Sequence, residues 1–176
     1  MSRRSAANCT PSNPCDDHKI TTARMTLIRN LVFAASPDDI FAAIADLGAI
    51  PEWIPAIRAA EVLTPGPLRA GSRFVQHAHF LFCAFPIEGR LTAFRPSREI
   101  AYRYSRGVVA GDWRYRISPA PSGTRLEICI YLTGSALLRP VVTWVVGRNI
   151  ARFARWAAAR AKARTAAAAG TAAAIQ

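Results

Sequence analysis

The sequence TRLEICIYLT, residues 124–133, is followed by ALLRPVVTWVVGRNIARFARWAAARAKAR, residues 136–164, and these two segments decide the fold. In the first segment, apolar side chains alternate with polar ones, as in a strand with one buried face; the apolar set is Leu126, Ile128, Ile130 and Leu132. In the second, apolar residues recur at helical spacing; they are Leu138, Val142, Val146, Ile150, Phe153 and Ala157. We therefore expect a half-buried strand and then a long amphipathic helix that covers its apolar face.

The residues before this stretch predict a further strand, two short helices and a meander of strands. Residues 26–34 are apolar enough for a first strand, and Ser36 is a suitable N-cap for a helix that starts with Pro37 and ends near Gly48. Pro51 and Pro55 limit the next helical segment to about one turn. Turn residues then separate six strand-like runs near residues 58–63, 73–82, 84–94, 99–106, 112–118 and 124–133. This order predicts an α+β domain in which an antiparallel sheet packs on the long C-terminal helix.

The two ends of the chain differ from the middle in composition. Residues 1–24 are rich in Ser, Asn, Pro, Asp and Thr and contain no apolar stretch, so we expect a disordered extension that is no secretory signal; translation could also begin at Met25. Residues 165–176 form an Ala-rich segment, expected to be a flexible tail. The predicted domain therefore spans residues 25–164, and no segment is long and apolar enough to cross a bilayer.

Charge and cysteine content bound the possible functions. The 176 residues include 23 Lys and Arg against 11 Asp and Glu, a formal charge of +12, but the arginines are scattered through the strands, which indicates a basic solvated surface. No recognition motif for nucleic acid accompanies them, so we expect no specific nucleic-acid partner. The cysteines have no metal-ligand spacing, so we expect no metal site, and the sequence contains no phosphate-cradling glycine loop or dinucleotide fingerprint, so we expect no cofactor. Cys83 and Cys129 lie in apolar runs and are expected to be buried free thiols, so we expect a cytoplasmic protein.

Four local segments carry a resemblance to a known superfamily. They are ASPDDIF at residues 35–41, IPEWIPAI at residues 50–57, RAGS at residues 69–72 and GRLTAFRP at residues 89–96. In their order and spacing, the chain from residue 25 to 164 resembles the START-like (SRPBCC) superfamily, and within it the polyketide cyclase/dehydrase-like branch. The resemblance implies the helix-grip fold, in which an antiparallel sheet wraps a long C-terminal helix, and an internal pocket for an apolar molecule such as a lipid, polyketide or quinone.

Aromatic and aliphatic side chains on the expected inner faces would line such a pocket. We predict contacts with the ligand from Trp53, Phe74, Phe85, Tyr102, Tyr104, Trp113, Tyr115, Val142, Val146 and Ile150. The alternative is that these aromatic side chains simply fill the core. The sequence does not identify the ligand or the oligomeric state.

Polyketide cyclase/dehydratase activity is the enzymatic alternative, and it would need an acid–base group and a donor to an enolate. The candidates are His77, His79, Glu88, Tyr102 and Asp112. His77 and His79 share one face of their strand, whereas the other face carries residues equally suited to the interior, so the sequence leaves the inward face of residues 73–82 open. We expect that alanine at His77 and His79 leaves ligand binding intact.

A third hypothesis places function on the surface of the C-terminal helix. Trp144 and Arg148 are four residues apart, as are Arg152 and Trp156, which gives an arginine-rich face edged with indole rings. Such a face could contact an anionic membrane or a protein partner. Cation–π pairing on a solvated helix would explain the same residues.

Overall fold

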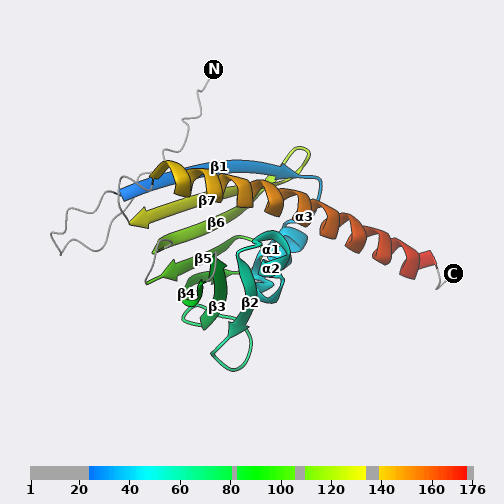
Figure 1. Ribbon diagram of the computed structural model, residues 1–176. Coiled ribbons are helices and arrows are strands. Elements are labelled where there is room, and N and C mark those ends of the chain that lie inside the picture. The colour runs from blue at the N-terminus through cyan, green and yellow to red at the C-terminus, as the bar shows by residue number, and fades with distance from the viewer. Residues whose placement is uncertain (1–23, 81–82, 106–109, 134–138, 174–176) are drawn as a thin grey trace, which may run out of the picture.

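The computed structural model describes residues 24–80, 83–105, 110–133 and 139–173, and its main feature is one antiparallel sheet. The strands are β1 (Arg24–Phe33), β2 (Ile57–Val62), β3 (Arg73–Phe80), β4 (Cys83–Arg95), β5 (Glu99–Tyr104), β6 (Gly111–Ala120) and β7 (Gly123–Thr133). They lie in the order β1-β7-β6-β5-β4-β3-β2, so only the pairing of β1 with β7 joins strands distant in sequence (Figure 1). The expected meander of strands is confirmed.

Three helices and a short 3-10 turn pack against one face of this sheet. They are α1 (Pro37–Ala45), the 3-10 turn at Leu47–Ala49, α2 (Ile50–Trp53) and α3 (Arg139–Ala173). Helix α3 lies against α1, α2 and β1, while α1 also contacts β5, β6 and β7, so the helices share the apolar face of the sheet. The α+β helix-grip fold predicted from the sequence is confirmed.

Local sequence explains where α1 begins. Ser36 has an extended backbone, and its hydroxyl oxygen accepts a hydrogen bond from the Asp39 amide at 3.1 Å, which caps one of the free amides of the first turn. Pro37 occupies the first helical position, where no amide donor is needed. The helix therefore starts at the residue that the capping pattern predicts.

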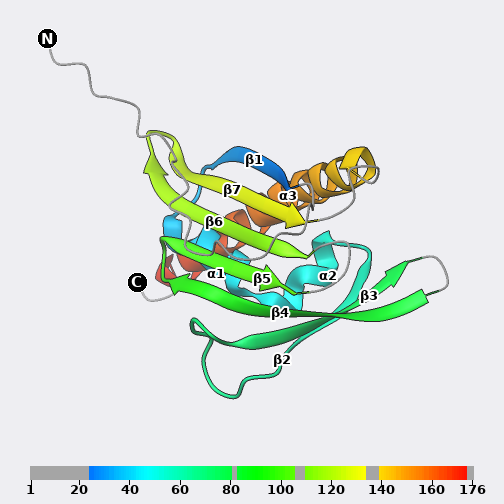
Figure 2. The same cartoon turned by 90° about the vertical axis from the view of Figure 1, so that its left-hand side faces the viewer.

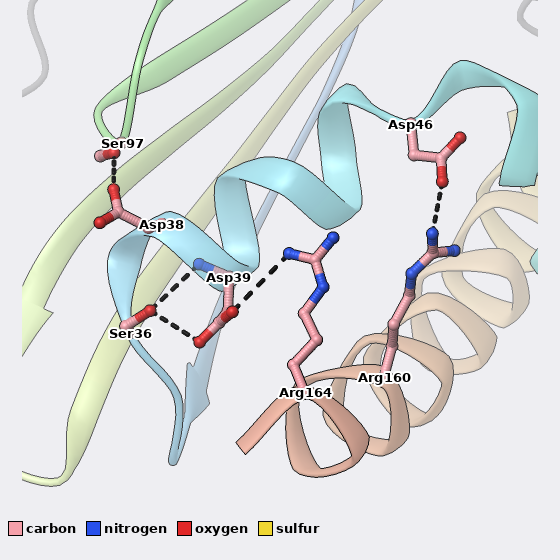
Figure 3. Close-up of polar contacts among 7 residues, drawn as sticks. All are labelled: Ser36, Asp38, Asp39, Asp46, Ser97, Arg160 and Arg164. Atoms are coloured by element: carbon pink, nitrogen blue, oxygen red, sulfur yellow. Dashed lines mark hydrogen bonds and ion pairs between the residues drawn. The ribbon is translucent and has the colours of Figure 1, made fainter. Parts of the chain in front are cut away.

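The part of α3 between Trp156 and Arg164 is held to α1 and α2 by polar contacts. Arg160 lies 2.5 Å from Asp46, and Arg164 lies 3.7 Å from Asp39, as Figure 3 shows. One turn earlier, the indole nitrogen of Trp156 donates to Glu52 at 2.6 Å. These contacts fix the position of this part of α3 above the two short helices.

Helix α3 extends further than the sequence analysis expected. Its predicted end near Arg164 is wrong, because the helix continues to Ala173. Alanine has the most favourable helix propensity, so an Ala-rich segment prolongs a helix that is already formed. The predicted start at residues 136–138 lies outside the described residues, and the domain boundaries at residues 25 and 164 stay predictions.

The hairpin of β3 and β4 extends beyond the core. Residues 83–86 are exposed on both faces of β4, and Figure 2 shows this end of the hairpin reaching past the neighbouring strands. The expectation that Cys83 is buried is therefore wrong: its side chain is exposed at this projecting end of the hairpin. Cys129, in the middle of β7, is buried as expected.

Candidate functional site

A small cavity lies between the sheet and α3. Strands β6 and β7, the end of α2 and the first half of α3 supply its walls, which are Trp53, Ile54, Trp113, Tyr115, Ile128, Val146, Asn149, Ile150 and Phe153. Its volume is about 20 Å³, which is enough for about one water molecule. The site is thus an apolar space that is nearly filled by its own walls.

Two indole nitrogens at this cavity have no hydrogen-bond partner among the residues that the structure describes. Trp53 closes α2, and its ring meets the Phe153 ring edge-on at 5.0 Å between centroids. Trp113 lies on β6 opposite Ile130 of β7. The Nε1 atoms of Trp53 and Trp113 are both buried and unpaired.

An aromatic cluster fills the core beside the cavity. Phe74 contacts both Tyr102 and Tyr104 edge-on, at centroid distances of 5.6 and 5.7 Å. Tyr104 in turn contacts Trp113 at 5.9 Å, and Tyr102 contacts Tyr115 at 5.8 Å. This cluster therefore links the two aromatic residues that β6 contributes to the cavity wall, Trp113 and Tyr115, with Phe74 on β3.

The backbone of β4 makes room for this cluster at Gly89. The Phe74 ring lies directly over this glycine, and a Cβ atom added there would stand 2.3 Å from the ring carbon Cζ. The side chain of Phe74 is fully buried as a result. Gly89 is thus required by close packing and not by an unusual backbone angle.

The buried tyrosine hydroxyls are neutral groups. Tyr102 donates to the carbonyl oxygen of Ile44 at 2.9 Å, and the Gln76 amide donates to the Tyr104 hydroxyl at 3.1 Å. Burial raises the pKa of Tyr102, of Tyr104 and of Tyr115 above the ordinary tyrosine value. These hydroxyls can act as hydrogen-bond donors, and not as bases, near neutral pH.

The structure distributes the ten predicted ligand contacts over three environments. The cavity is lined by Trp53, Trp113, Tyr115, Val146 and Ile150. The core next to it contains Phe74, Tyr102, Tyr104 and Val142. Phe85 is 39% exposed at the projecting end of the hairpin and is not part of the cavity wall: it has the inward parity of β4 but lies beyond the covered part of the sheet.

Four wall residues were not among the predicted ligand contacts: Ile54, Ile128, Asn149 and Phe153. The signal for Ile128 and Phe153 was present, because both belong to the apolar patterns of β7 and α3. Asn149 gave no such signal, since a polar residue next to an apolar stripe is usually solvated.

The histidines lie on the outer face of the sheet. Residues 74, 76 and 78 of β3 are buried, whereas His77 and His79 are exposed, so the even-numbered side chains face the core. The His77 Nε2 atom is 3.5 Å from a carboxylate oxygen of Glu61 on the neighbouring strand β2. The inward parity that the sequence left open is therefore settled, and the histidines do not reach the cavity.

The acidic candidates also lie away from the cavity. Glu88 is exposed and pairs with Arg73 at 3.3 Å, across the β3–β4 pair. Asp112 pairs with Arg103 at 2.7 Å across β5 and β6. Neither carboxylate belongs to the cavity wall, whose described residues include no carboxylate, histidine or lysine.

The first half of α3 presents a second candidate surface. Val141, Trp144 and Val145 are exposed, Trp144 to 62% of its full area. The Arg148 guanidinium carbon lies 5.2 Å from the centre of the Trp144 ring. Among the described helices, none combines the length and apolar character needed to cross a membrane.

Comparisons with known proteins relate this architecture to a family. A family profile described as "polyketide cyclase / dehydrase and lipid transport" matches residues 24–169. No curated protein sequence matches the chain.

Solved structures show the same fold at low sequence identity. The Zhui aromatase/cyclase from a Streptomyces species is 18% identical over 81% of this chain and 96% of its own, with a TM-score of 0.67. The di-domain aromatase/cyclase StfQ of the steffimycin biosynthetic pathway is 16% identical with the same TM-score; the match covers 81% of this chain but 52% of StfQ, so this chain spans about half its length. A START superfamily protein from Mycobacterium smegmatis is 17% identical over 79% of this chain and 97% of its own, with a TM-score of 0.60.

Proposed function

The chain belongs to the family of polyketide cyclases, dehydrases and lipid transport proteins, and on this premise we propose that it binds a hydrophobic small molecule between the sheet and α3. The predicted relation to the START-like superfamily is confirmed by the same family and by the shared fold. The observation that carries the proposal is the cavity itself. Its wall is apolar apart from a few hydrogen-bonding groups, which is the usual composition of a small-molecule site.

Binding requires the cavity to widen. Ligand pockets commonly enclose about 300–1,000 Å³, whereas this cavity holds about 20 Å³. The moving part that we propose is the first half of α3, which precedes the contacts of Trp156 with Glu52 and of Arg160 with Asp46. The turns of α3 from Trp156 onward are fixed to α2 and α1 by these contacts, so they would act as the anchor.

A neutral environment-sensitive fluorophore, N-phenyl-naphthylamine, tests the proposal, because a neutral probe is not attracted by the basic surface. We expect saturable binding at one site. Val146→Phe should abolish it by adding more bulk than the cavity can hold. The matched control is Val145→Phe: Val146 is 4% exposed and its neighbour Val145 is 41% exposed on the same helix, so this variant should bind the probe normally.

Two further variants keep this experiment interpretable. Ile150→Ala enlarges the cavity and should retain or strengthen probe binding, even if Val146→Phe proves to be misfolded by circular dichroism. Alanine at both His77 and His79 should leave binding unchanged, because these side chains are on the outer face. Absence of saturable binding in the unmodified protein, or equal binding by the Val146→Phe and Val145→Phe proteins, would contradict the proposal.

Cyclase or dehydratase activity is the enzymatic form of the same proposal, and the family supports it. The described cavity wall offers only neutral groups, namely two indoles, one phenol and one amide. A reaction in this cavity would therefore depend on hydrogen bonds to a developing enolate, with the proton leaving to another acceptor. Binding without catalysis agrees better with these groups.

The exposed apolar residues of α3 favour a second function, peripheral contact with an anionic membrane. Exposed Val141, Trp144 and Val145 lie on a helix whose sequence, residues 139–173, contains seven basic and no acidic residues. Flotation with phosphatidylcholine vesicles, with and without phosphatidylserine, tests this contact. We expect salt-sensitive binding to the anionic vesicles that Trp144→Ala weakens; equal flotation of both proteins would exclude this use of the helix.

A further inference from the structure

We infer that the ligand is a neutral molecule with a carbonyl-type acceptor oxygen, and that Trp53 and Trp113 donate their indole hydrogens to it. The inference deepens the proposed function and rests on it. It starts from the buried Nε1 atoms of these two residues, which have no partner in the structure.

The four tryptophans of the chain differ in a way that singles out the cavity. The Trp156 indole donates to Glu52, and Trp144 is 62% exposed on the outside of α3. The two remaining indoles both line the cavity and are the buried side-chain polar atoms left without a partner among the described residues. Buried donors are nearly always hydrogen-bonded in folded proteins, because leaving one unpaired forfeits its bond to water.

The two indoles lie in opposite walls of one cavity, so both can donate to the same ligand. Trp53 comes from α2 and Trp113 from β6, so they enter the cavity wall from the helical layer and from the sheet. The rest of the wall consists mainly of Ile, Val and Phe side chains, which offer no acceptor. Tyr115 and Asn149 carry acceptor oxygens, but neither accepts a hydrogen bond from the two indoles. A ligand that brings its own acceptor oxygen would satisfy donors that the protein leaves unsatisfied.

The charge of the wall limits the ligand class. An indole N–H donates and cannot accept, so the ligand atom must be an acceptor. Among the described residues, the cavity wall contains no arginine or lysine, so these residues supply no counterion for a buried carboxylate or phosphate. A ketone, ester or quinone-type oxygen on an otherwise apolar body meets both conditions.

Tetralin and α-tetralone form a suitable pair of probes, since they have similar shapes and only the second carries a carbonyl oxygen. We expect the unmodified protein to bind tetralone about tenfold more tightly than tetralin, the factor that one or two good hydrogen bonds supply. Trp113→Phe and Trp53→Phe keep an aromatic ring but remove the N–H group, and each should reduce this preference several-fold. Trp144→Phe is the matched control and should leave the preference unchanged.

A second measurement uses the unmodified protein, so that it does not depend on the folding of any variant. In ¹⁵N-labelled protein, the indole N–H signals of Trp53 and Trp113 should move downfield with tetralone and not with tetralin, while the signals of Trp144 and Trp156 stay in place. Signals that respond equally to both probes would overturn the inference.

The outcomes separate this inference from the proposed function. Equal affinity for both probes, or a tetralone preference that survives in both Trp→Phe proteins, would overturn the acceptor-oxygen inference and leave hydrophobic binding in place. Either result would mean that water, and not the ligand, accepts the hydrogen bonds of the two indole N–H groups. If neither probe binds and the naphthylamine fluorophore also fails, the proposed function falls and this inference falls with it.

Discussion

Replacing Phe153 with alanine should remove much of the contact between α3 and the rest of the core. Phe153 is 2% exposed, and its ring meets Phe33, Trp53 and Trp156 at centroid distances of 6.5, 5.0 and 6.0 Å. Burial of a phenylalanine side chain contributes about 1.5–3 kcal/mol, and an edge-on aromatic pair adds about 0.5–1.5 kcal/mol. We therefore expect Phe153→Ala to lower the free energy of unfolding by about 3–5 kcal/mol.

Urea unfolding followed by circular dichroism measures this loss, and a thermal melt should show a fall of about 6–20 °C. Trp144→Ala is the control, because Trp144 is a large aromatic residue on the exposed side of the same helix. It should cost no more than about 1 kcal/mol, the scale of its cation–π contact with Arg148. Equal losses in the two variants, or a loss below about 1 kcal/mol for Phe153→Ala, would refute the assignment of the buried face of α3.

Two other substitutions or conditions test the packing of the core. Gly89→Ala should destabilise the fold by about 1–3 kcal/mol in urea, because its Cβ would meet the Phe74 ring, and the cost should shrink in a Phe74→Ala background; additive losses would contradict this clash. Stability should be lost as pH rises above about 10, the ordinary tyrosine pKa, because burial raises the pKa of Tyr102, Tyr104 and Tyr115 in the folded state while the unfolded chain ionises first. Each buried tyrosine lowers the free energy of unfolding by up to about 1.4 kcal/mol per pH unit in this range. In the Tyr115→Phe protein, the urea midpoint should therefore fall less with rising pH than in the unmodified protein. An unchanged pH dependence would argue against the burial of Tyr115.

The sequence carried strong signals for the fold. The alternation from Leu126 to Leu132 predicts one buried face because a shift by one residue would expose every apolar side chain of β7. Val146, Ile150 and Phe153 likewise recur at helical spacing, and all three are buried in α3. Ends of elements were less predictable, since the end of α3 depends on the helix propensity of alanines that make no distinctive pattern.

The site was predictable only in part. Alternation tells which face a side chain occupies but not whether another element covers that point, which is why Phe85 has the inward parity of β4 and is still exposed. For β3 the two faces carry residues of similar character, so only the burial seen in three dimensions separates Gln76, which is buried, from His77, which is exposed. The size of the cavity and the unpaired indole of Trp113 depend on how side chains fit together in three dimensions, which no periodic pattern encodes.

The pairing of β1 with β7 sets a condition on how the protein is made. Arg24 of β1 lies opposite Thr133 of β7. Strand β1 is therefore synthesised before the other six strands but can pair only after β7, the last of them, has been made. Until residues 123–133 are synthesised, β1 has no neighbour in the sheet, and its inward Met25 and Leu27 remain available to chaperones or to other nascent chains. If synthesis stops before β7, strand β1 therefore remains unpaired with its apolar side chains exposed. We expect cellular quality control to recognise the incomplete chain at this strand.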